Sequence, residues 1–227
     1  MNVAVSYLYI LPILVVGIFF LLSLAIQAWQ DWVYMKWGTI DNSRRISGAE
    51  TAQLILSTYA LNDVVVRLGI DRGYMVRDAY DPHSKIVWLS LDNFKGESVT
   101  ALAVSAQRSA QALQDASGYP MFRLRSWLLP LANFGATYGP IMLPFGIFTG
   151  FLPLLYISAL LFVGAILIHL VTLPVEFNAN KRALRQMENL ELVSEQKLVG
   201  VRRVLAAAAM AYVGAAATQF NDKISHG

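Results

Sequence analysis

The sequence contains no cysteine and few charged residues. Without a thiol, this chain of 227 residues cannot form disulfides, thiolate metal sites or a cysteine nucleophile. Aspartate, glutamate, lysine and arginine make up 15% of the residues, against roughly a quarter in soluble domains. The low charge therefore excludes an ordinary soluble protein. The net charge of +3 fits a membrane protein with its basic residues on one side, so we expect no nucleic-acid partner.

Apolar residues are abundant instead, at 56% of the chain with a mean hydropathy of +0.48. This composition predicts a mainly α-helical protein embedded in a lipid bilayer. Residues 3–29 carry no charge and are long enough to cross the bilayer as a first transmembrane helix. A cleavable signal peptide is the alternative, but it would have a basic start and a shorter apolar core.

A second apolar region, residues 128–173, is too long for one crossing. Pro140, Pro144 and Gly150 interrupt it, so we expect a hairpin of two transmembrane helices at 128–149 and 152–173. The alanine-rich residues 204–220 are the fourth candidate, with Ala207, Ala211 and Ala215 four residues apart. The alternative for this last segment is an alanine-rich helix packed on the bundle surface.

The basic residues predict the orientation of these helices. Eleven of the 18 lysines and arginines lie between residues 30 and 127, six lie between 174 and 203, and one lies after 220. Four crossings place seventeen of them on one side. By the positive-inside rule that side is the cytoplasm, and both termini are outside. Residues 174–203 then form a cytoplasmic helical segment.

The polar residues 31–126 are predicted to form a small cytoplasmic α+β domain between the first and second transmembrane helices. Ser47 and Glu50 have the spacing of a capping box at the start of a helix. Alternating or β-branched apolar runs between turn residues indicate short strands. The predicted elements are helices at 48–60 and 98–116 and strands at 64–70 and 85–91.

Four blocks between residues 40 and 220 carry a resemblance to a known family. They are YDPHSKIVWLS at Tyr80–Ser90, ALAVSAQRSAQALQDASGY at Ala101–Tyr119, LRSWLLPLANFG at Leu124–Gly135 and LVTLPVEFNANKRAL at Leu170–Leu184. In order and spacing they resemble the neutral zinc metallopeptidases of bacterial membranes. The resemblance implies a zincin-like cytoplasmic domain and a location in the bacterial inner membrane.

The family's metal site is expected on a helix carrying His-Glu-x-x-His, in which both histidines bind zinc and the glutamate activates water. In this sequence Gln107, Arg108 and Gln111 occupy those three positions. The distal acid that completes the family's site matches Glu176, which is retained. Ala79 stands where the family tends to have a further histidine.

This departure predicts a degenerate site. Glutamine amides are poor zinc ligands, and the guanidinium of Arg108 cannot accept a proton as a general base. We therefore expect no metal, no cofactor and no catalysis, and interpret the chain as a pseudopeptidase: an accessory, scaffold or adaptor subunit that binds other membrane-protein subunits. The alternative is an active zinc-dependent endopeptidase with unconventional ligands. Candidates for those ligands are His83, His169, Glu176 and Asp78.

Glu176 would need a positive partner if it is buried without a metal. We expect Arg108 to provide it, as a structural ion pair that takes the place of zinc. The alternative is that Arg108 and Glu176 are both simply exposed.

Overall fold

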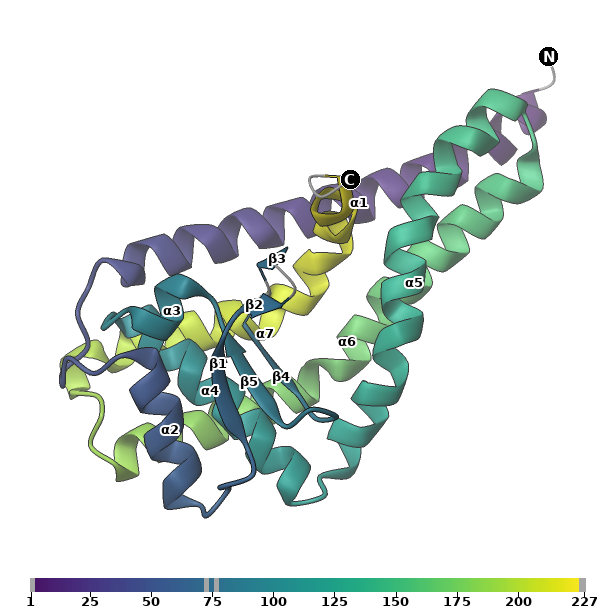
Figure 1. Ribbon diagram of the computed structural model, residues 1–227. Coiled ribbons are helices and arrows are strands. Elements are labelled where there is room, and N and C mark those ends of the chain that lie inside the picture. Colours follow the sequence, from purple (N-terminus) through teal and green to yellow (C-terminus); the bar gives the residue numbers. More distant parts are fainter. Residues whose placement is uncertain (1–2, 72–73, 76–77, 225–227) are drawn as a thin grey trace. The chain divides into compact units, whose positions relative to one another are not determined.

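The computed structural model describes residues 3–71, 74–75 and 78–224, with side chains described for 9–69 and 78–210. The chain is mainly helical with a small sheet (Figure 1), which confirms the predicted fold class at this level. Its helices are α1 (Val3–Gly38), α2 (Gly48–Thr58), α3 (Leu91–Lys95), α4 (Val99–Ala116), α5 (Pro120–Thr149), α6 (Leu152–Asn189) and α7 (Glu195–Ile224). Its strands are β1 (Val65–Leu68), β2 (Ile70–Asp71), β3 (Tyr74–Met75), β4 (Ala79–Asp81) and β5 (Ile86–Leu89).

The chain forms two compact units, and α1, α5, α6 and α7 each contribute to both. The first, which we call the apolar unit, takes the chain up to Trp29, residues 124–173 and the chain from Met210 onward. The second, which we call the polar unit, contains residues 30–123 and 174–209. Each unit has its own buried core.

In the apolar unit, α5 and α6 pack closely through small residues. A Cβ added to Gly135 would lie 2.4 Å from the backbone oxygen of Leu161. One turn along α5, the backbone oxygen of Gly139 accepts a hydrogen bond of 2.5 Å from Ser158 Oγ. The two helices are joined at Gly150, which has a φ of +66° that favours glycine. Small residues at such contacts are typical of helices that pack in lipid.

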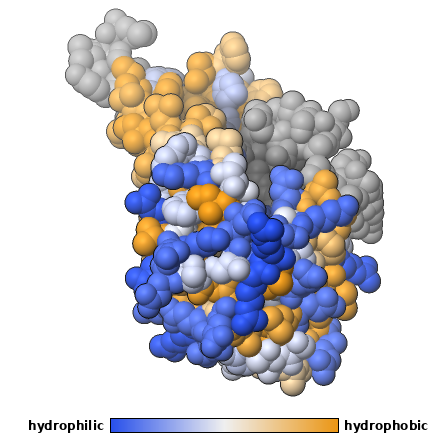
Figure 2. Space-filling model, turned by 90° about the vertical axis from the view of Figure 1, so that its left-hand side faces the viewer, coloured by the Kyte–Doolittle hydropathy of each residue, from blue (hydrophilic) through white to orange (hydrophobic). Residues whose placement is uncertain are grey.

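The exposed surface of the apolar unit is rich in large apolar side chains. Phe148 is 88% exposed, Leu160 is 74% exposed and Phe145 is 61% exposed. Figure 2 shows apolar residues gathered over one part of the protein surface and hydrophilic residues over another. Exposed apolar surfaces of this kind are typical of sites that contact a membrane or another protein.

Two helices are long and apolar enough to cross a membrane, by length and composition alone, among the residues that were described. They are Tyr9–Gly38 in α1 and Leu152–Asn189 in α6. The predicted crossings at 128–149 and 204–220 do not appear among them, and the side chains of 211–220, including Ala211 and Ala215, lie outside the described residues. Four crossings therefore remain a prediction.

The sheet of the polar unit has the strand order β1-β5-β4. β1 runs parallel to β5, with Val65 opposite Ile86, and β4 runs antiparallel to β5, with Tyr80 opposite Val87. β2 and β3 form a separate antiparallel pair. The sequence predicted β1 and β5 as strands but missed β4, because three residues are too few to show an alternating pattern.

Helix α2 begins at the predicted capping box. Glu50 N donates to Ser47 Oγ over 3.2 Å, and Ser47 N donates to Glu50 Oε2 over 2.7 Å. At the first residue of the helix, a Cβ on Gly48 would lie 2.0 Å from the backbone oxygen of Asn93. Only glycine therefore allows α2 to approach α3 this closely.

Helix α4 is the centre of the polar unit, and α2 and α3 pack against it. Ser98 caps its first turn by accepting a hydrogen bond from Ala101 N. At its far end Asp115 accepts hydrogen bonds from Tyr80 Oη over 2.8 Å and from Lys85 Nζ over 2.6 Å. Burial, followed by the hydrogen bond to Asp115, raises the pKa of Tyr80. These contacts fix α4 against the β4–β5 hairpin.

Candidate functional site

Three glutamine side chains lie along one face of α4. Gln107, Gln111 and Gln114 are separated by four and three residues, which places them on the same side of a helix. All three are buried, at 1% exposed or less. The sequence singled out the first two, and the structure shows that this face of α4 is turned toward α6.

Glu176 on α6 accepts hydrogen bonds from two of these amides. Gln107 Nε2 donates to Glu176 Oε2 over 3.3 Å, and Gln111 Nε2 donates to Oε1 over 3.2 Å and to Oε2 over 3.0 Å. The Glu176 side chain is 0% exposed. A carboxylate only accepts hydrogen bonds, so its presence dictates that both amides turn their NH2 groups toward it.

Further amide contacts join α4, α6 and α7. Gln107 Nε2 also donates to Asn180 Oδ1 over 2.9 Å, and Asn180 Nδ2 donates to the backbone oxygen of Leu205 on α7 over 2.9 Å. Gln114 Nε2 donates to the backbone oxygen of Val175 over 2.9 Å. We call Gln107, Gln111, Glu176 and Asn180 the amide–carboxylate network. It links three helices of the polar unit at one buried point.

Arg108 is buried beside the network, at 4% exposed. Its Nη1 donates to Gln111 Oε1 over 3.3 Å, while the amide nitrogen of Gln111 donates to Glu176. Gln111 thus connects the guanidinium to the carboxylate. The alternative that Arg108 and Glu176 are both exposed is wrong, whereas their direct ion pair remains a prediction.

The other residues named from the sequence are not gathered at this network. Ala79 lies in β4, paired with Trp88. His83 is exposed in the turn before β5, where its backbone N–H donates to Asp81 Oδ1. Asp78 accepts hydrogen bonds from Ser90 and Asn93, and His169 belongs to the apolar unit. Within the part of the chain that is described, no group of three or more histidine, aspartate or glutamate side chains could hold a metal ion.

Comparisons with known proteins place the sequence in a family. The model of a family described as "Putative neutral zinc metallopeptidase" matches residues 12–222. The chain belongs to the neutral zinc metallopeptidase family. It is 36% identical over 183 residues to "Putative membrane protease YugP" of Bacillus subtilis (strain 168), which covers 81% of this chain and 80% of that protein. No solved structure matches.

These findings correct one expectation from the sequence. The loss of His-Glu-x-x-His led to the prediction that the chain is not an enzyme, but the family is described as a peptidase and the Bacillus relative as a protease. Neither description indicates inactivity or an accessory role. The prediction was wrong because it inferred the activity of the whole protein from three residues alone, Gln107, Arg108 and Gln111.

The residues at the family's expected metal position do not fit zinc. Zinc needs lone pairs from imidazole, thiolate or carboxylate groups. Here the groups turned toward Glu176 are amide NH2 groups, which donate hydrogen bonds and have no lone pair to offer. The cationic Arg108 is hydrogen-bonded to the same Gln111 and would oppose a metal cation. A zinc ion bound to Glu176 would displace the hydrogen bonds that Gln107 and Gln111 donate to this carboxylate.

Sequence reasoning missed Gln114 and Asn180, which are parts of the same set of contacts. A signal for Gln114 was present, because it falls on the same helix face as Gln107 and Gln111. Asn180 likewise lies one helical turn after Glu176. The zinc motif gives no signal for either residue, because it specifies metal-ligand positions only.

Proposed function

We propose that this protein is a membrane-bound peptidase, an enzyme that hydrolyses peptide bonds of polypeptides at the cytoplasmic face of a bacterial inner membrane. The family match over residues 12–222 is the observation that carries the proposal, since it extends over nearly the whole chain. The likeness to a putative membrane protease and two helices suited to crossing a membrane support it. The lipid bilayer is then the protein's immediate partner.

The proposed topology has four crossings with both termini outside. The concentration of basic residues in two segments supports it, as does the tight connection of α5 and α6 at Gly150. The polar unit then belongs to the cytoplasmic side. The crossings are residues 3–29, 128–149, 152–173 and 204–220, and the cytoplasmic segments are 31–126 and 174–203.

Within this enzyme, we assign the amide–carboxylate network a structural role. It holds α4, α6 and α7 together where the family's zinc site is expected. The positive charge of Arg108 balances the negative charge of Glu176, and Gln111 is hydrogen-bonded to both side chains. A buried carboxylate is stabilised only when its oxygens are hydrogen-bonded and its charge is compensated. The groups that hydrolyse the substrate are therefore residues other than Gln107, Arg108 and Gln111.

A cleavage assay tests the function. The full chain, purified in mild detergent and in liposomes, is incubated with a fluorescently labelled unfolded polypeptide, with and without added divalent metal ions. We expect cleavage that increases with protein concentration. A mock purification from cells that lack the gene controls for contaminating proteases. Absence of cleavage under all these conditions would refute the peptidase proposal.

The same assay tests the structural role of the network. Gln107→Ala, assayed at a temperature where circular dichroism shows it folded, should still cleave, because the Gln107 amide takes no part in hydrolysis. Gln53→Ala, which changes an exposed glutamine on α2, is the matched control. Complete loss of cleavage in folded Gln107→Ala, with normal cleavage by Gln53→Ala, would contradict the structural assignment while leaving the peptidase proposal intact.

A further inference from the structure

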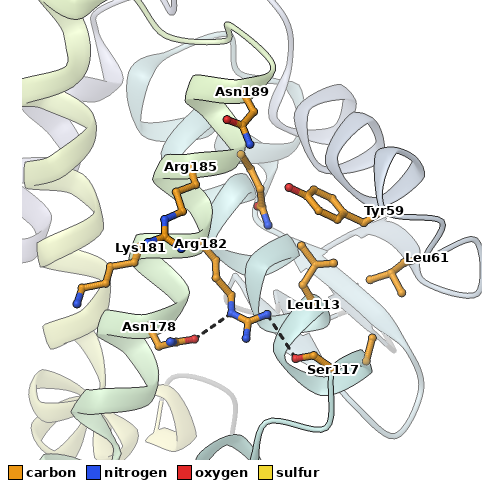
Figure 3. Close-up of a pocket in the computed structure, with 11 residues that line it drawn as sticks. Tyr59, Leu61, Leu113, Ser117, Asn178, Lys181, Arg182, Arg185 and Asn189 are labelled. Carbon is orange, nitrogen blue, oxygen red and sulfur yellow. Dashed lines mark hydrogen bonds between the residues drawn. The ribbon is translucent and has the colours of Figure 1, made fainter.

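The polar unit contains an open pocket of about 670 Å³. One wall is the polar half of α6, and the other is formed by the end of α2 and the last turns of α4 (Figure 3). Tyr59, Leu61 and Leu113 make the α2 and α4 side largely apolar. The volume lies within the range of small-molecule sites, roughly 300–1,000 Å³. The pocket is separate from the amide–carboxylate network.

The α6 wall carries three positive charges and no acid. Lys181, Arg182 and Arg185 all line the pocket, and no aspartate or glutamate does. None of the three forms an ion pair with a carboxylate of any residue that the structure describes. Three uncompensated cations on one wall generate a positive potential that attracts an anion.

Arg182 is held in place by neutral groups. Its Nε donates to Asn178 Oδ1 over 3.0 Å and its Nη1 donates to Ser117 Oγ over 3.4 Å (Figure 3). Asn178 is in turn fixed by Gln114 Nε2, which donates to the same Oδ1 over 3.0 Å. Because these partners carry no charge, they orient the guanidinium without neutralising it. An oriented guanidinium is suited to binding two oxygens of a phosphate group.

Gln186 lines the same wall, and its amide oxygen is buried. Its side chain is 3% exposed, and its Oε1 has no hydrogen-bond partner among the described residues. A buried acceptor without a partner costs free energy, which a hydroxyl donor from a ligand would recover. The pocket thus combines anion-binding cations, one acceptor for a hydroxyl and an apolar wall.

We propose that this pocket binds a phosphate ester that also carries a hydroxyl group. Arg182 binds the phosphate oxygens, while Lys181 and Arg185 at the rim balance its charge. Gln186 accepts a hydrogen bond from the hydroxyl, and Tyr59 and Leu113 cover the carbon atoms of the ester. The same chemistry occurs in a phospholipid headgroup and in a soluble sugar or glycerol phosphate. A peptide carboxylate has two acceptor oxygens and no hydroxyl of its own, so it matches this set of groups less well than a phosphate ester with a hydroxyl.

Calorimetric titration of the full chain in neutral detergent with glycerol 3-phosphate tests this proposal. We expect saturable binding that weakens as salt rises. Arg182→Gln should weaken it by at least about tenfold, because it removes charge-assisted hydrogen bonds. Arg202→Gln, which changes an exposed arginine on α7 outside the pocket, should bind like the native protein. Circular dichroism confirms that each variant is folded.

Competition identifies the source of the phosphate. Displacement of glycerol 3-phosphate by phosphatidylglycerol micelles, but not by phosphatidylcholine, indicates a lipid headgroup, and no displacement by either indicates a soluble ester. Both results support the site. The proposal is overturned if glycerol 3-phosphate does not bind, if Arg182→Gln binds like Arg202→Gln, or if an unphosphorylated peptide displaces the ligand at equal concentration. None of these outcomes depends on whether the protein cleaves polypeptides.

Discussion

A triple variant, Gln107→His, Arg108→Glu and Gln111→His, is expected to bind roughly one zinc ion per chain. Positions 107 and 111 are one helical turn apart, and both native side chains already reach Glu176. The imidazole nitrogens of histidines at these positions would therefore face the Glu176 carboxylate, so that all three side chains would bind one zinc ion between them. Removing Arg108 also removes the cation beside it. Metal analysis of the variant after gel filtration measures the result.

Two controls make this outcome specific to the site. Adding Glu176→Ala to the triple variant should weaken zinc binding strongly, because the third protein ligand is lost. A variant with Gln107→His, Arg108→Glu and Gln111→Ala should not retain zinc through gel filtration. A triple variant that folds and retains no zinc would show that α4 and α6 do not have the geometry of the family's metal site.

Glu176→Ala in the otherwise native chain is expected to lower the free energy of unfolding by about 3 kcal/mol. The substitution removes the acceptor for Gln107 and Gln111. It also removes the carboxylate that we propose as the partner of buried Arg108. It also leaves a cavity among α4, α6 and α7. Thermal or denaturant unfolding of the purified protein in detergent, followed by circular dichroism, measures the change.

Glu188→Ala is the matched control, because Glu188 is an exposed acid on the same helix. Its effect should stay within about 0.5 kcal/mol, as for most surface substitutions. Glu176→Gln should lie between the two, since it keeps one acceptor oxygen but turns a new NH2 group toward the glutamine amides. Equal stability of Glu176→Ala and Glu188→Ala would mean that the network does not stabilise the polar unit.

Local elements with strong chemical signals were predictable from the sequence. The capping box at Ser47 and Glu50 is confirmed, and α4 begins one residue after its cap, Ser98. Strands β1 and β5 were recognised by their β-branched and aromatic runs. Their parallel pairing was not predictable, because register and direction depend on contacts between segments that are distant in the sequence.

The site was predictable only in part, because amides and carboxylates at helical spacing fit both an emptied metal site and a hydrogen-bond network. The structure shows that Gln107 and Gln111 donate to Glu176, and that Asn180 extends these contacts to α7. Burial of Arg108 and Glu176 could not be deduced from composition, since arginine and glutamate are usually exposed. The departures from the motif at Gln107, Arg108 and Gln111 concern metal binding at this one network, and they do not show whether the protein is active.

Zinc analysis of the native chain and of Glu176→Gln tests the account most directly. The protein is purified without chelators, incubated with one equivalent of zinc and passed through gel filtration. We predict that neither protein retains zinc at the amide–carboxylate network, so that their metal contents are equal. Stoichiometric zinc in the native chain that is lost in folded Glu176→Gln would contradict the structural role assigned to Gln107, Gln111 and Glu176.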